Sequence, residues 1–212
     1  MDKPASMTVG AYLSRVVLPQ ELLKDRHGMH RLLWRAFPDK LEGTVQPFLF
    51  REEPFAPVAP GEVAYSVQSG EYPAWDELLG LRVVSCERVE TVFAADDRFY
   101  FRLLASPVRR LMSPDAIRQR GHTEIKRLPP RQWTQAWFDR RAQQAGFEPL
   151  ELIFDLGKVR VARQDQSFKL QAVQFDGLLK VGDPERFAVA WQAGIGPKKA
   201  FGFGLLSLRR AR

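Results

Sequence analysis

The order in which strand and helix patterns follow one another is the feature that most limits the folds this chain can adopt. Apolar residues that alternate, or that are β-branched, mark strands, and apolar residues three and four positions apart mark helices. In chain order, the first half shows a strand over 11–18, a helix over 27–37, strands over 48–51 and 62–68, a short helix over 73–79 and a strand over 81–90. The first half therefore has the order β-α-β-β-α-β.

The same order returns in the second half of the chain. Its predicted elements are a strand over 99–104, an irregular basic stretch over 113–127, a helix over 131–145, strands over 147–154, 158–163 and 170–181, a helix over 184–193 and a strand over 205–208. This order is that of the ferredoxin-like fold. We therefore expect an α+β protein of two tandem ferredoxin-like (RRM-like) β-α-β-β-α-β domains over 1–92 and 93–212, with the first few residues disordered.

Positive charge is concentrated in the second half. Residues 1–92 carry 10 Lys and Arg against 13 Asp and Glu, a net charge of −3, whereas residues 93–212 carry 22 against 12, a net charge of +10. Hydrophobic residues make up 45% of the chain, which is a globular and not a disordered composition. The basic half indicates binding to a polyanion, above all nucleic acid, although a basic surface without a partner would show the same charge.

The cysteine content and the lack of long apolar runs indicate where the chain works. Cys86 is the single cysteine, so no intrachain disulfide can form, which fits a reducing cytoplasm. No apolar run is long enough to span a bilayer, and residues 1–10 do not have the pattern of a signal peptide. We expect a cytoplasmic protein that does not bind a membrane.

A glycine-rich segment precedes the last strand pattern. Residues 194–204 (GIGPKKAFGFG) contain four glycines together with Lys198 and Lys199. Glycine lets backbone N–H groups approach a ligand closely, and the two lysines add positive charge, so the segment is suited to bind phosphate. An ordinary turn before an edge strand would produce the same pattern, because glycine-rich loops are weak signals on their own.

The predicted helix over 27–37 places histidines on its polar face. Its apolar stripe consists of Met29, Leu32, Leu33, Ala36 and Phe37. At 100° per residue, His27, His30, Arg31 and Trp34 gather on the opposite face. A histidine near a helix N-terminus is kept neutral by the helix dipole and can accept a proton, although a solvated surface histidine fits the pattern as well.

Four stretches carry a resemblance to a known family. They are residues 12–16 (YLSRV), 30–38 (HRLLWRAFP), 101–107 (FRLLASP) and 194–208, with its two pairs of glycines. In these stretches the chain resembles the CasE (Cse3) family of CRISPR-associated endoribonucleases, which process repeat RNA in the Cascade complex. The family is built from two ferredoxin-like domains, so the resemblance and the order of elements imply the same fold.

The resemblance implies cleavage of CRISPR repeat stem-loops in precursor RNA, without metal or other cofactor. In such cleavage the ribose 2′-OH attacks the adjacent phosphorus, which leaves a 2′,3′-cyclic phosphate and a 5′-OH and needs a general base and a general acid. His30 matches the family's catalytic histidine and is the predicted base. His27 stands where the family often has tyrosine, and we hypothesise that it is the acid; a role in capping or orienting the helix is the alternative.

The resemblance and the charge pattern together give a set of RNA contacts. The predicted RNA-binding residues are Arg31, Arg102, Arg109, Arg110, Arg118, Arg120, Lys126, Arg127, Lys158, Arg160, Arg163, Gly196, Lys198, Lys199 and Gly202. Two positions depart from the family pattern, because Ser106 stands where the family usually has asparagine and Leu104 where it has arginine. Stem shape, phosphates and a few unpaired bases should carry recognition, since the deep groove of an RNA stem is hard to read.

Two other functions fit parts of the sequence. In a non-catalytic RRM-like RNA-binding subunit, residues 199–204 (KAFGFG) would be an RNP1-like signature whose Phe201 and Phe203 stack on bases. In an inactive Cascade subunit, the chain would only retain the processed RNA. The preferred prediction is a single-turnover endoribonuclease that stays bound to its product beside other Cascade subunits and is a monomer when isolated.

Overall fold

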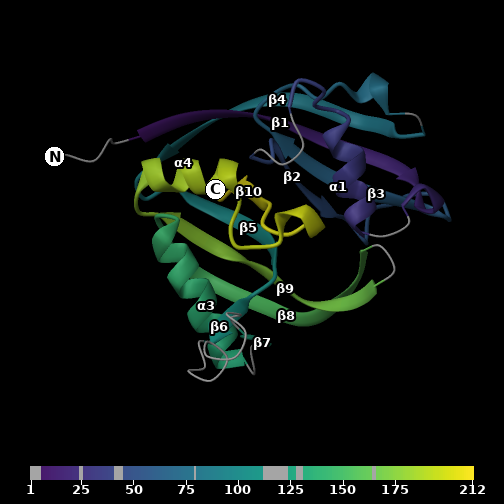
Figure 1. Ribbon diagram of the computed structural model, residues 1–212. Coiled ribbons are helices and arrows are strands. Elements are labelled where there is room, and N and C mark those ends of the chain that lie inside the picture. Colours follow the sequence, from purple (N-terminus) through teal and green to yellow (C-terminus); the bar gives the residue numbers. More distant parts are fainter. Residues whose placement is uncertain are drawn as a thin grey trace.

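The structure of the chain is a computed structural model, shown in Figure 1. It describes residues 6–23, 26–40, 45–78, 80–111, 124–127, 131–163 and 166–212. Among these residues, no helix is long and apolar enough to cross a membrane.

The first sheet has the strand order and directions of a ferredoxin-like fold. Its elements are β1 (Ser6–Pro19), the short turn η1 (Gln20–Leu22), α1 (Arg26–Trp34), β2 (Phe48–Glu52), β3 (Glu62–Ser69), η2 (Trp75–Glu77) and β4 (Arg82–Ala94). The strands lie in the order β2-β3-β1-β4, and every neighbouring pair is antiparallel. The predicted short helix over 73–79 is only the three-residue 3₁₀ turn η2 within the described residues.

The second sheet repeats this arrangement, as Figure 1 shows. Its elements are β5 (Arg98–Ala105), the hairpin strands β6 (Val108–Leu111) and β7 (Glu124–Arg127), α3 (Arg131–Gln144), β8 (Phe147–Arg163), β9 (Gln166–Val181), α4 (Pro184–Ala193), η3 (Lys199–Phe201) and β10 (Leu206–Arg210). The strand order β10-β5-β9-β8 matches that of the first sheet. The predicted class, α+β with two ferredoxin-like units, is confirmed.

Several element boundaries differ from the prediction. The strands predicted over 147–154 and 158–163 form one strand, β8, because Gly157 continues the ladder opposite Ala172. The stretch predicted as irregular over 113–127 ends in β7, which pairs with β6. β1 already begins at Ser6, inside the N-terminal segment, and the residues before it lie outside the described ranges.

The helix α4 follows its local sequence signals closely. The Asp183 side chain accepts a hydrogen bond from the backbone N–H of Arg186, and Pro184 occupies the first turn, where a missing N–H costs nothing. Gly194 ends the helix at φ 77°, a conformation that favours glycine. This helix was predicted with the correct ends.

Two hydrophobic cores lie on the helix-covered faces of the sheets. The first packs α1 against the first sheet, around Met29, Leu33, Phe48 and Phe50. The second packs α3 and α4 against the second sheet and includes Val9, Ala11 and Phe93 from the first sheet. The chain passes from one sheet to the other between Ala94 and Arg98, but the second core draws on both halves.

A buried arginine connects the two sheets. Arg51 of β2 is 5% exposed, and its guanidinium donates to the backbone oxygens of Arg102 and Leu205 at 3.4 and 3.5 Å and to Ser207 Oγ at 3.0 Å. Its charge is balanced by Glu53, whose Oε1 lies 2.7 Å from Nη2. β2 is thereby held to β5 and β10, and with them to the end of the glycine-rich segment.

We predict that Arg51→Met lowers the free energy of unfolding by about 3–5 kcal/mol, because it leaves the partly buried Glu53 carboxylate without its cation. Urea unfolding at neutral pH measures the change. Arg82→Met is the matched control, since Arg82 pairs with Glu62 at 3.0 Å while its side chain is 60% exposed, and we expect a loss below about 1 kcal/mol. Equal losses in the two variants would contradict the role given to Arg51.

Candidate active site

The helix α1 places His30 on the border between core and surface. Met29 and Leu33 are fully buried, as the apolar stripe predicts, and Arg31 is exposed. Trp34 is only 9% exposed and packs against Phe48 at 5.7 Å between ring centroids, so its predicted place on the solvent face is wrong. The helix is therefore covered on more of its circumference than a single stripe suggests.

Aromatic side chains hold the imidazole of His30. Its ring centroid lies 5.7 Å from that of Phe48 and 6.1 Å from that of Trp34. The planes of the imidazole and the indole meet at 86°, an edge-on arrangement. Trp34 Nε1 donates a hydrogen bond of 3.1 Å to His30 Nε2. His27 belongs to the same helix one turn earlier, but its side chain lies outside the described residues.

The glycine-rich segment lies beside this helix, because η3 packs against α1. Its glycines make room for large side chains: a Cβ on Gly194 would lie 2.8 Å from Leu49, and one on Gly196 would lie 3.1 Å from Trp137. Phe203 is fully buried and so is not available to stack on a base, which contradicts the RNP1-like alternative at that residue. The segment thus has a packing role that the sequence did not indicate, and phosphate binding by Gly196 and Gly202 stays a prediction.

Two lysines of the segment sit next to a further cation. Lys198 adopts the left-handed conformation at φ 69°, with its ammonium 6.0 Å from the Phe201 ring centroid. Lys199 is half-buried, and burial, together with the nearby Arg141, lowers the pKa of its ammonium. Arg141 also lies over the Trp137 ring, at 5.7 Å. Like charges gathered at one place favour an anion as ligand.

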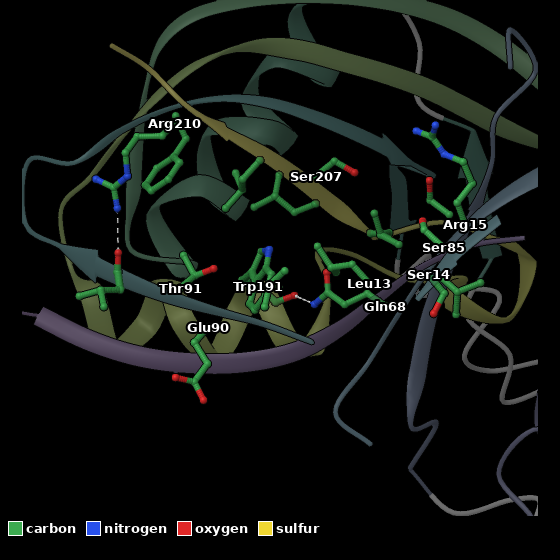
Figure 2. Close-up of a pocket in the computed structure, with 18 residues that line it drawn as sticks. Leu13, Ser14, Arg15, Gln68, Ser85, Glu90, Thr91, Trp191, Ser207 and Arg210 are labelled. Atoms are coloured by element: carbon green, nitrogen blue, oxygen red, sulfur yellow. Dashed lines mark hydrogen bonds between the residues drawn. The ribbon is translucent and has the colours of Figure 1, made fainter. Parts of the chain in front are cut away.

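A groove of about 700 Å³ opens between the sheets, away from His30. Leu13, Arg15 and Gln68 line it from the first sheet, and Trp191 and Arg210 from the second half of the chain (Figure 2). Gln68 Nε2 crosses it to donate to the Trp191 backbone oxygen at 2.8 Å. Of the predicted catalytic and RNA-binding residues whose side chains the structure describes, none lines this groove. Within the described residues, no group of three or more His, Cys, Asp or Glu side chains could hold a metal ion.

With this geometry in place, similarity to known proteins identifies the family. The sequence profile of the CRISPR associated protein family matches residues 11–210. The chain belongs to this family. It is 31% identical over 201 residues to the CRISPR-associated endoribonuclease Cse3 of Thermus thermophilus, covering 88% of this chain and 90% of that protein. It is 28% identical over 201 residues to the Cascade subunit CasE of Escherichia coli, covering 93% of this chain and 98% of that protein.

Solved structures of CRISPR-associated proteins share the fold. The endoribonuclease Cse3 bound to a 19-nucleotide RNA superimposes with a TM-score of 0.79 at 29% identity, covering 95% of this chain and all of that one. Cas6e of Escherichia coli gives a TM-score of 0.77 at 26% identity, covering 94% of this chain and all of that one. The resemblance read from the sequence to the CasE (Cse3) family is confirmed.

Within this CRISPR-associated fold, the predicted RNA contacts fall into separate places. α1 lies against β8, the strand that carries Lys158, Arg160 and Arg163, and against η3. The β6–β7 hairpin, which carries Arg109, Arg110, Lys126 and Arg127, is drawn at the bottom of Figure 1, well away from α1. The side chains of these seven residues, and Arg118 and Arg120 altogether, lie outside the described residues.

Among the predicted RNA-binding residues, Arg102 forms a well-defined ion pair within the protein. Its Nε donates to Asp176 Oδ1 at 2.7 Å, and this bond raises the pKa of the guanidinium. The side chain is 52% exposed on β5. An arginine has further N–H groups, so a phosphate contact is compatible with this ion pair.

Sequence reasoning missed three residues that shape the site. Arg51 sits in an otherwise apolar run (FLFRE), a pattern that marks a buried arginine only once a partner surface is known. Arg141 could not be recognised as a neighbour of Lys199, because the two are far apart in the sequence and nothing local relates them. Trp34 was placed on the wrong face, although its spacing of four from His30 is a signal for a side-chain pair.

We predict that Lys199→Met stabilises the RNA-free protein at neutral pH by no more than about 1 kcal/mol, because solvent screens the half-exposed ammonium. A lowered lysine pKa means that folding disfavours the charged form. The penalty is thus fully present below the folded-state pKa and disappears as the pH rises towards the unfolded-state value. Urea unfolding at pH 7 and at about pH 10.5, near the ordinary lysine pKa, measures this, and a variant less stable than the parent at pH 7 would refute it.

Proposed function

We propose that this protein is an endoribonuclease that cleaves the repeat stem-loops of CRISPR precursor RNA into guide RNA. The observation that carries the proposal is the similarity to the endoribonuclease Cse3 over most of the chain. It is supported by the position of His30 on α1, the helix that packs against η3 of the lysine-bearing segment. The protein belongs to a family with this activity, and its charge suits a polyanion.

In the proposed reaction, His30 accepts the proton of the ribose 2′-OH as the oxygen attacks the adjacent phosphorus. The bond from phosphorus to the 5′-oxygen breaks, and the leaving oxygen takes up a proton from a general acid, for which His27 is the candidate. Lys198 and Lys199, on the loop beside α1, are suited to balance charge on the non-bridging phosphate oxygens. No metal enters these steps, and a ligand without a 2′-OH is bound but not cut.

The proposal extends to the partners and setting of the protein. The Escherichia coli relative is a Cascade subunit, and we place this chain in a corresponding complex, where it keeps its product hairpin. Binding should weaken steeply with salt, because phosphate contacts release counterions. A cytoplasmic location agrees with the single free cysteine, Cys86.

His30→Ala should lower the single-turnover cleavage rate by about 10²–10⁴-fold, the usual contribution of a general base. The assay uses a repeat hairpin in EDTA, and hairpin affinity is measured separately by filter binding. Arg35→Ala, a change of an exposed residue directly after the end of α1, serves as the control and should cut at the parental rate. The proposal would be refuted if His30→Ala cut as fast as the parent, or if the parent required magnesium. Tight binding of the hairpin by the parent without any cutting would indicate a non-catalytic subunit.

His27→Ala should slow the same single-turnover reaction by at least about 10²-fold if His27 donates the proton to the leaving oxygen. A hairpin whose 5′-oxygen is replaced by sulfur tests this directly, because the sulfur leaves without needing an acid. Cleavage of that RNA should be nearly equal for the parent and His27→Ala. Near-parental cutting of the ordinary hairpin would exclude the acid role and leave His27 a part in orienting the helix.

A further inference from the structure

The hydrogen bond from Trp34 to His30 constrains the imidazole chemically. An indole N–H can only donate, so the nitrogen that receives it must carry a lone pair. His30 Nε2 is therefore unprotonated, and in the neutral ring the hydrogen must sit on Nδ1. The contact selects one of the two tautomers of His30.

The surroundings make this a fixed contact and not a chance approach of two surface groups. Trp34 is 9% exposed and packs edge-on against Phe48, which is itself 2% exposed and stacked on Phe37. His30 and Trp34 are four residues apart on α1, so the helix itself brings the two rings together. Packing in the core thus fixes the Trp34 indole, and its hydrogen bond fixes the orientation of the His30 imidazole.

We infer that Trp34 is a positioning residue for His30: its indole N–H keeps the lone pair on Nε2, ready to accept the proton of the ribose hydroxyl. This rests on the proposed role of His30 as the base. In the RNA-free protein the indole N–H occupies this lone pair, and the 2′-OH would displace it when RNA binds. Without the indole, the ring would be free to carry its hydrogen on Nε2, and that form has no lone pair on Nε2 to accept the proton.

The tautomer can be observed without any reaction. Two-bond and three-bond ¹H–¹⁵N correlations of the imidazole at neutral pH should report the Nδ1–H form for His30 in the parent, with His30→Ala used for assignment. Trp34→Phe keeps an aromatic ring in the core but removes the donor, and it should shift the signals towards the Nε2–H form. Trp75→Phe is the matched control, because Trp75 is 6% exposed in the same core and its indole N–H has no hydrogen-bond partner among the described residues.

Cleavage provides the second readout. Trp34→Phe should lower the single-turnover rate about 3- to 10-fold, the scale of one hydrogen bond between neutral groups, while hairpin affinity stays within about 2-fold. Trp75→Phe should change neither quantity. An unchanged His30 tautomer in Trp34→Phe overturns the inference, and so does an altered tautomer with an unchanged cleavage rate.

A measurement on Trp34 itself covers the case in which Trp34→Phe does not fold. In His30→Ala the indole N–H loses its acceptor, so its proton resonance should move upfield and exchange faster with water than in the parent. No movement of that resonance overturns the inference. The two proposals fail separately, because parental cutting by His30→Ala removes the catalytic role while the tautomer measurement still reports whether Trp34 sets the ring.

Discussion

The arrangement of the two halves depends on one buried guanidinium. Arg51 is the point where β2 of the first sheet meets β5 and β10 of the second, through two backbone carbonyls and a serine hydroxyl. A buried arginine is costly unless every part of it has a partner, and here Glu53 neutralises it while Ser66 donates to the same carboxylate oxygen at 2.8 Å. Because the arginine needs this full set of partners, it favours the relative placement of the sheets in which all of them are in reach.

Close packing then carries that placement to the candidate site. The glycine-rich segment leaves the second sheet's helix α4 at Gly194 and touches side chains of the first sheet and of α3, since Gly194 meets Leu49, Gly202 meets Phe50 and Gly196 meets Trp137. Larger residues at these positions would push the segment away from β2 and α3. Lys198 and Lys199, at the start of η3, therefore lie on a segment that packs against α1, with glycines on either side of it.

The sequence predicted the fold well wherever local chemistry decides it. The ferredoxin-like topology of both halves is correct, and α4, with Asp183 before Pro184 and Gly194 at its end, is correct at both ends. Errors arose where the outcome depends on distant residues. β8 runs unbroken through Gly157 because β9 pairs with it along its whole length, and no local pattern shows that ladder.

For the site, the sequence could name residue types but not their contacts. The family resemblance directed attention to His30, and helical spacing put it one turn before Trp34. A simple two-faced helix nevertheless placed Trp34 in solvent, because Phe48, which covers it, comes from another element, β2. Networks such as that of Arg51 join positions up to 156 residues apart and cannot be read from periodicity.

The shared second core has a consequence for how such a chain can change over evolutionary time. Val9, Ala11 and Phe93, all from the first sheet, are packed among the aromatic rings of the second, and Phe93 lies 4.8 Å from Phe187 of α4. The first core is built from the first half alone, whereas the second core needs residues of both halves. Although the two halves share one topology, a second half exchanged between relatives would have to fit the apolar surface that these three residues of the first sheet present.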